Sequence, residues 1–273
     1  MNKSYMNVIL FIFLIFIIII FFIFLCVKFY EKKMIFYPLK ELNANPSNIG
    51  LEFENIYLIT KDNIKIHGWF IPNNLTSKTI LFFHGNAGNI SYRIDIIEIL
   101  STLNVNIFII DYRGYGNSNG KPSEKGMYID AITAYEYLIN QKKIKPENII
   151  IYGKSIGTTA AIDLASKVKI GKLIVDSGLT SAKDMSKIII PFIPVYLFLN
   201  VKFNSIKKIA NVNCPKLFIH SIDDKIIPFS MGQKLYEKAN YPKKFYESTG
   251  SHNDFLYINK NKINKILDKF INN

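Results

Sequence analysis

The most constraining feature of this 273-residue sequence is a series of short, wholly apolar runs that recur from residue 80 onward. Each run is too short for an ordinary helix, and the segments between successive runs are long enough to hold one. Continuous apolar strands that alternate with helices are typical of a parallel sheet covered on both faces. The runs are Ile80-Leu81-Phe82-Phe83, Ile107-Phe108-Ile109-Ile110, Ile149-Ile150-Ile151, Leu173-Ile174-Val175 and Leu217-Phe218-Ile219.

Other elements can be placed around these runs. Residues 54–60 and 64–71 alternate or are rich in β-branched side chains around the turn Lys61-Asp62-Asn63, which predicts an antiparallel hairpin. A last strand is expected at residues 245–247. The whole predicts one α/β domain over residues 54–273, with a mostly parallel, doubly wound sheet. Helices are expected at residues 124–140, 156–168, 229–239 and 254–271.

The amino-terminal segment has a different character, because every residue from Val8 to Val27 is apolar. As a helix this run is about 30 Å long, which matches the hydrocarbon thickness of a bilayer. A cleaved signal peptide would have a shorter apolar core and small residues at its cleavage site, and Phe24-Leu25-Cys26-Val27-Lys28 offers no such site. We therefore expect an uncleaved, single-pass membrane anchor at residues 1–30, followed by a linker at residues 31–53.

Charge and cysteine content limit the expected partners. The formal net charge is +13, but the lysines are scattered and accompany no nucleic-acid-binding motif, so the expected partner is a lipid bilayer and not nucleic acid. The two cysteines, Cys26 and Cys214, predict neither a disulfide nor a metal site, and no cofactor is expected. A cytosolic catalytic domain is favoured because Lys3 precedes the apolar run and three lysines follow it: Lys28, Lys32 and Lys33.

The sharpest motif is Tyr152-Gly153-Lys154-Ser155-Ile156-Gly157, which follows a predicted strand and opens a predicted helix. Its two glycines permit the tight strand-to-helix turn that exposes a serine hydroxyl at the carboxyl edge of a sheet. A phosphate-binding loop is the main alternative, but its first glycine would fall at Asn148, inside the predicted strand that precedes the motif. The motif therefore predicts Ser155 as a nucleophile.

A serine hydroxyl requires a base that takes its proton and an acid that orients the base. In hydrolases with this turn the order along the chain is nucleophile, acid, base, which selects His252 and an aspartate near residue 223. Asp223 and Asp224 are not separated by spacing alone; Asp224, just before an apolar turn, is favoured, and Asp223 is then a turn or cap residue. A structural role is expected for the other histidines, His67, His84 and His220.

The oxyanion that forms on attack requires backbone N–H donors already in place. One is expected from Ile156, the residue after the nucleophile. The second is expected from the loop after the strand at residues 80–83, where Gly85 and Gly88 let the backbone approach a substrate. Asn86 is the predicted donor, with Ala87 as the alternative.

These segments together resemble the α/β hydrolases. Within them they are most similar to single-pass, membrane-anchored serine hydrolases related to the α/β-hydrolase-domain protein depalmitoylases. The resemblance implies the α/β-hydrolase fold. It also implies that the protein cleaves an ester or thioester bond in acylated proteins or lipids, through an acyl-serine intermediate. The depalmitoylases attach through an amino-terminal cysteine cluster, whereas here a spanning helix is expected. Four segments carry the resemblance: residues 83–89, 111–116, 146–158 and 250–254.

One apolar stretch, residues 188–199, lies within a predicted cap insertion at residues 183–209 and contains Pro191 and Pro194. In this fold such insertions cover the carboxyl edge of the sheet above the nucleophile, so we expect the stretch to line an acyl pocket; the alternative is that it completes a core. The first interpretation predicts medium or long acyl chains as substrates. A serine peptidase of related fold and a catalytically silent membrane-bound scaffold are the alternative functions.

Overall fold

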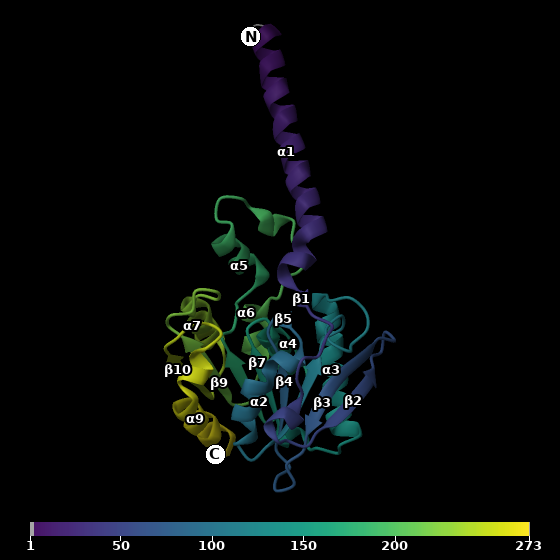
Figure 1. Cartoon of the computed structure of the whole chain (residues 1–273). Coiled ribbons are helices and arrows are strands. Elements are labelled where there is room, and N and C mark those ends of the chain that lie inside the picture. Colours follow the sequence, from purple (N-terminus) through teal and green to yellow (C-terminus); the bar gives the residue numbers. More distant parts are fainter. Residues whose placement is uncertain (1–2, 273) are drawn as a thin grey trace.

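The computed structural model describes residues 3–272 and consists of an α/β domain from which one long helix projects (Figure 1). That helix, α1 (Lys3–Ile35), is long and apolar enough to cross a membrane, and its most apolar stretch has no residue buried against the domain. It runs past residue 30 into the segment predicted as a linker. The rest of that segment contains strand β1 (Tyr37–Pro38), which pairs with β5 (Ala87–Gly88), and the 3-10 turn η1 (Pro46–Ile49).

The domain is built on an eight-stranded sheet with the order β10-β9-β8-β7-β4-β6-β3-β2. At one edge β2 pairs with β3 and β3 with β6 in antiparallel fashion, and all other pairs in this sheet are parallel. This arrangement confirms the predicted α/β-hydrolase fold. The strands are β2 (Glu54–Ile59), β3 (Lys65–Ile71), β4 (Thr79–Phe83), β6 (Asn106–Asp111), β7 (Ile149–Lys154), β8 (Lys172–Asp176), β9 (Lys216–Ser221) and β10 (Lys243–Ser248).

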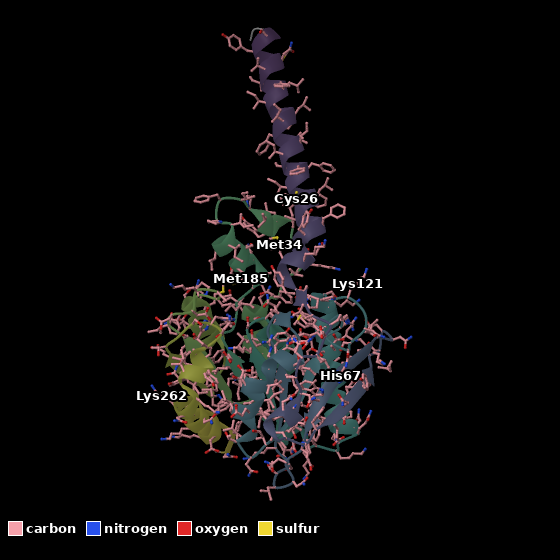
Figure 2. The ribbon with its side chains drawn as sticks, in the orientation of Figure 1. Cys26, Met34, His67, Lys121, Met185 and Lys262 are labelled. Carbon is pink, nitrogen blue, oxygen red and sulfur yellow. The ribbon has the colours of Figure 1, made fainter. Side chains whose placement is uncertain are left out.

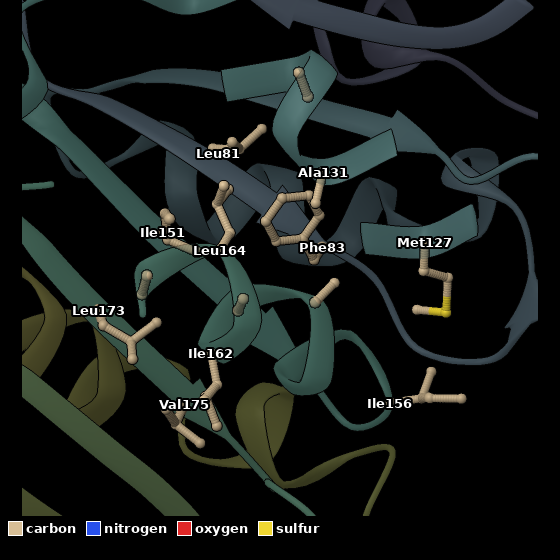
Figure 3. Close-up of a cluster of buried hydrophobic side chains, with 14 of the residues drawn as sticks. Leu81, Phe83, Met127, Ala131, Ile151, Ile156, Ile162, Leu164, Leu173 and Val175 are labelled. Atoms are coloured by element: carbon tan, nitrogen blue, oxygen red, sulfur yellow. The ribbon is translucent and has the colours of Figure 1, made fainter. Parts of the chain in front are cut away.

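Helices cover both faces of the sheet, because alternate residues of its apolar strands point to opposite sides. Leu81 and Phe83 of β4 belong to a core that also includes side chains of α3 (Glu124–Asn140), α4 (Gly157–Ala165) and α7 (Phe229–Lys238), and Figure 3 shows part of this core. Ile80 and Phe82 pack on the other face with α2 (Ile94–Ser101), which was not predicted, and α9 (Lys260–Asn272).

The prediction of one helix over residues 254–271 is wrong. The structure has a short α8 (Phe255–Ile258) and then α9, with Asn259 between them. The side-chain amide of Asn259 donates to the carbonyl oxygens of Thr249 and Phe255, at 2.8 and 2.9 Å. The backbone of Asn259 has φ −103° and ψ 19°, outside the helical region, which separates the two helices.

An insertion between β8 and β9 lies over the carboxyl edge of the sheet and beside α1 (Figure 1). Its helix α5 (Ala182–Ile189) is capped by Ser181, whose hydroxyl accepts the N–H of Asp184 at 3.0 Å, and ends before Pro191. The turn η4 (Val195–Leu197), helix α6 (Ser205–Lys208) and turn η5 (Ile209–Asn211) follow. We call residues 182–199 the cap.

Candidate active site

Ser155 lies in the turn between β7 and α4, with a backbone φ of 55°, in the left-handed region that non-glycine residues rarely adopt. Gly153 and Gly157, two residues before and after Ser155, lie so close to neighbouring atoms that there is no room for a side chain. A Cβ at Gly153 would lie 2.6 Å from Thr158 Cα, and one at Gly157 would lie 2.1 Å from the carbonyl oxygen of Phe83. The Ser155 N–H is held by the Asp176 carbonyl oxygen at 2.8 Å. The G-x-S-x-G spacing therefore supports a strained turn packed tightly against β4.

The structure brings Ser155, His252 and Asp224 together, although 97 residues separate the first two. His252 Nε2 lies 3.0 Å from Ser155 Oγ, and His252 Nδ1 lies 2.6 Å from Asp224 Oδ2. All three residues are buried. The distances are those of hydrogen bonds, so the imidazole can accept a proton from the hydroxyl while the carboxylate holds its other nitrogen.

The two adjacent aspartates have different surroundings. Asp224 Oδ1 accepts the backbone N–H groups of Ile226 and Ile227, both at 2.9 Å, which leaves Oδ2 to face the imidazole. Asp223 is exposed, and its carboxylate accepts the Gly250 N–H at 3.0 Å, two residues before His252. Asp223 therefore ties together the loops that carry the acid and the base, and does not contact the ring.

His220 is a further neighbour of the acid. Its Nε2 lies 2.9 Å from the carbonyl oxygen of Ile227 and 3.4 Å from Asp224 Oδ2. Burial by itself would raise the pKa of Asp224, but hydrogen bonds from His220 and His252 lower that pKa below its ordinary value. The carboxylate is therefore charged at neutral pH. No local pattern in the sequence predicts this contact, because His220 lies in strand β9 and Asp224 in the loop after it.

The two residues predicted to supply the oxyanion donors, Ile156 and Asn86, line the same cavity as Ser155. In the part of the chain that the structure describes, the backbone N–H groups of Ile156 and Asn86 have no acceptor. The Asn86 carbonyl oxygen, by contrast, accepts the Tyr115 hydroxyl at 2.7 Å and the Tyr37 N–H at 3.2 Å. These bonds fix the peptide while its N–H stays free, which is the arrangement that an oxyanion site requires.

A buried cluster of His67, His84 and Asp111 lies next to the loop that carries Asn86. His84 Nε2 and His67 Nδ1 lie 3.7 and 3.8 Å from the Asp111 carboxylate, whose Oδ1 accepts the Ile90 N–H at 2.9 Å. Burial, together with the charge of Arg93, lowers the pKa of His84 to about 3. His84 is therefore neutral at physiological pH and does not reach Ser155, in keeping with a structural role.

A cavity of about 680 Å³ opens above Ser155 and His252. Its walls come from the Gly85–Ala87 loop, from the cap and, unexpectedly, from the end of α1. Three charged side chains line it: Glu31, Arg93 and Lys154. Sequence reasoning assigned no role to Glu31 or Arg93. The described residues contain no cluster of His, Cys, Asp and Glu side chains that could hold a metal ion.

Comparison with known proteins agrees with this architecture. A model of the alpha/beta hydrolase fold matches residues 78–199. The protein bem46 of Schizosaccharomyces pombe is 34% identical over 241 residues, which cover 82% of this chain and 81% of bem46. This chain belongs to the alpha/beta hydrolase family. The membrane protein YNL320W of Saccharomyces cerevisiae is also 34% identical, over 77% of each chain.

Two solved structures extend the comparison. The Pyrococcus furiosus esterase Pf2001 superposes with a TM-score of 0.74 over 87% of this chain and 97% of that chain, at 22% identity, which shows a common fold. An alpha-beta hydrolase from Vibrio vulnificus is 26% identical, with a TM-score of 0.69 over 81% of this chain and 82% of that chain. Membership of this family supports hydrolase activity.

Proposed function

We propose that this chain is a membrane-anchored serine hydrolase that cleaves an ester or thioester through an acyl-serine intermediate. The observation that carries the proposal is the continuous line of hydrogen bonds from Asp224 through His252 to Ser155, at the floor of the cavity. Such a line in a buried site matches the needs of nucleophilic catalysis, because the hydroxyl is a poor nucleophile until a positioned base removes its proton.

In the first half-reaction Ser155 Oγ attacks the acyl carbon while His252 Nε2 takes the hydroxyl proton. Asp224 accepts a hydrogen bond from Nδ1–H and stabilises the imidazolium that forms. The N–H groups of Ile156 and Asn86 donate to the oxyanion. The tetrahedral intermediate collapses, the leaving alcohol or thiol takes the proton from His252, and the acyl group remains on Ser155.

In the second half-reaction a water molecule gives a proton to His252 and attacks the acyl-serine carbon. Collapse of the second tetrahedral intermediate returns the proton to Ser155 Oγ and releases a carboxylic acid. His252 thus acts as base and acid in each half, so the cycle needs no cofactor.

The walls of the cavity favour an apolar acyl group. Apolar side chains of the cap lie above Ser155, among them Met185, Ile190 and Leu199. Each additional buried methylene contributes about 0.8 kcal/mol, or roughly fourfold in affinity, until the cavity is full. We therefore expect medium or long acyl chains, of acylated proteins or lipids, to be preferred over acetyl groups.

The anchor belongs to the same proposal. The apolar length of α1 suits a single membrane crossing, and the lysines that follow it favour a cytosolic position for the domain.

The test is labelling of the full-length chain in detergent micelles with a fluorescent fluorophosphonate. We expect the wild type to be labelled and Ser155→Ala to be unlabelled. Ser230→Ala, which changes an exposed serine on α7, is the matched control and should label as the wild type does. A folded wild-type protein that takes up no probe would overturn the proposal and favour a silent scaffold.

A further inference from the structure

The last turns of α1 form one wall of the cavity. Val27, Glu31, Met34 and Ile35 all line it, and their i, i+4, i+7, i+8 spacing places them on one face of the helix. From Val27 to Ile35 this face extends about 12 Å along the axis. Since Val27 is the last residue of the apolar run, the cavity reaches from the boundary of the predicted membrane span to Ser155.

The opposite wall is the cap. Ala182, Met185, Ser186 and Ile189 line the cavity from α5, again at helical spacing. Met34 of α1 and Met185 of α5 both line the cavity, and Figure 2 labels Met34 between α1 and the cap and Met185 by α5. The cavity therefore lies between α1 and the cap, and neither element alone encloses it.

Polar and aromatic contacts hold α1 against the segment that follows the cap. The buried carboxylate of Glu31 accepts the side-chain amide of Asn200 at 2.7 Å and the backbone N–H of Val201 at 2.8 Å. Closer to the membrane span, the rings of Phe24 and Phe198 meet edge to face, with centroids 5.9 Å apart. The end of the cap is thus fixed beside a residue of the apolar run itself.

The tip of the cap is exposed and apolar. Phe192 is 96% exposed, Leu197 66% and Ile189 64%. Exposed apolar patches of this kind mark protein or membrane contacts. Here the patch adjoins α1, so a bilayer that surrounds α1 reaches it as well. Lys183 and Lys187 lie over the Tyr196 ring, at 5.1 and 5.3 Å, a pairing suited to the headgroup region.

We propose that the tip of the cap, residues 188–198, inserts into the membrane leaflet next to α1, and that acyl chains pass from this leaflet into the cavity between α1 and the cap. The α1 helix is then a part of the acyl-binding site as well as an anchor. The passage of substrate rests on the proposed hydrolase function, whereas the insertion of the tip does not.

Insertion is tested with tryptophan fluorescence in vesicles that contain brominated phosphatidylcholine. The chain has one tryptophan, Trp69, which is only 1% exposed. Phe192→Trp should be quenched by the bromine atoms, as should Phe16→Trp within α1. Leu75→Trp is the matched control, because Leu75 is 86% exposed in the loop before β4, at the opposite edge of the sheet from Ser155, and it should not be quenched. Quenching of Phe16→Trp without quenching of Phe192→Trp would overturn the insertion.

The role of α1 in acyl binding is tested with Met34→Trp, which fills the cavity from the helix side. We expect the ratio of kcat/KM for a dodecanoyl ester to that for an acetyl ester to fall at least tenfold. Phe29→Trp is the matched control, because Phe29 is 75% exposed on α1 and does not line the cavity, and it should keep the wild-type ratio. An unchanged ratio in a Met34→Trp protein that still takes up fluorophosphonate would contradict this role without touching the serine mechanism.

A second inference comes from Arg93, which lines the cavity beside the oxyanion loop. Its guanidinium donates to the carbonyl oxygens of Tyr92 and Ala87, and its buried Nε has no partner. Among residues 3–272 no carboxylate lies within ion-pair distance of it, and Asp95 and Asp111 act on it only from farther away. Glu31, the acidic side chain of the cavity wall, is already hydrogen-bonded to Asn200 and Val201.

From this unneutralised guanidinium we infer an anion subsite, at which Arg93 binds a phosphate or carboxylate on the substrate. The inference rests on the proposed hydrolysis. Full-length protein is assayed with glycerol mono-oleate, its 3-phosphate and its hemisuccinate. Arg93→Gln should raise KM at least tenfold for the anionic ester whose anion Arg93 binds, which is either the phosphate or the hemisuccinate. For the neutral ester, KM should rise less than threefold. Equal losses on all three esters, with fluorophosphonate labelling retained, would show that Arg93 only supports the loop.

Discussion

Replacing Asp224 with asparagine should move the ring proton of neutral His252 from Nδ1 to Nε2. The two backbone N–H groups of Ile226 and Ile227 hold Oδ1 at 2.9 Å, and they keep the single oxygen of an asparagine amide in that place. The NH₂ group then faces His252 Nδ1, where the carboxylate oxygen lies at 2.6 Å. Nδ1 must become the acceptor, so the ring proton moves to Nε2 and points at Ser155 Oγ, and the ring can no longer take the serine proton.

The expected loss in kcat is about 10⁴-fold, which corresponds to about 5.4 kcal/mol in the activation barrier. The assay is hydrolysis of p-nitrophenyl octanoate by the full-length protein in micelles, together with the Tm of each variant. Asp223→Asn is the matched control. It keeps an acceptor for the Gly250 N–H and should lose less than about tenfold. A larger loss for Asp223→Asn than for Asp224→Asn would transfer the role of the acid to Asp223.

Four further outcomes are expected. Ser155→Ala should lose at least about a thousandfold in kcat/KM with an unchanged Tm, and activity within tenfold of the wild type would mean that the nucleophile is misassigned. In a panel of p-nitrophenyl esters kcat/KM should rise from acetate to medium or long chains; acetate as the best substrate would refute the acyl pocket. Gly157→Ala should unfold the turn or destabilise the domain by more than about 2 kcal/mol, because the new Cβ would lie 2.1 Å from the Phe83 oxygen; a wild-type Tm would show that the turn can relax. The pKa of His84 is about 3 in the folded chain and 6.5 in the unfolded chain, so protonation favours unfolding below pH 6.5. The free energy of unfolding should therefore fall by up to about 1.36 kcal/mol per pH unit as the pH drops from 6.5 towards 3. Denaturation curves of His84→Gln, measured over the same pH range, should lack this part of the pH dependence.

Local patterns in the sequence predicted most of the sheet and the reacting groups. The apolar runs lie on β4, β6, β7, β8 and β9, because strands buried on both faces must be apolar throughout. Ser155, His252 and Asp224 could be predicted because each occupies a loop at the carboxyl edge of a strand in a known order along the chain. Their assignment as a catalytic triad remains a prediction that the experiments above test.

Contacts between residues far apart in the chain could not be predicted from local sequence patterns. Glu31 appeared as one acidic residue among lysines, and its partners Asn200 and Val201 lie 169 and 170 residues away. The i, i+4, i+7, i+8 face of α1 was hidden because nearly every residue before it is apolar, so no amphipathic stripe stands out. Arg93 belonged to a helix-forming segment that was not recognised, and its direction towards the cavity depends on how the oxyanion loop packs.

The most direct test of the central claim is capture of the acyl group on Ser155. Full-length protein in micelles is mixed rapidly with p-nitrophenyl octanoate, quenched in acid, digested and mapped by mass spectrometry. Acyl-serine formation predicts a burst of p-nitrophenol of up to one equivalent per active site, wherever hydrolysis of the acyl-serine is the slower step, and an octanoyl group on the peptide that contains Ser155. Steady turnover with Ser155 unmodified and the acyl group on another residue, or activity undiminished in Ser155→Ala, would contradict the account.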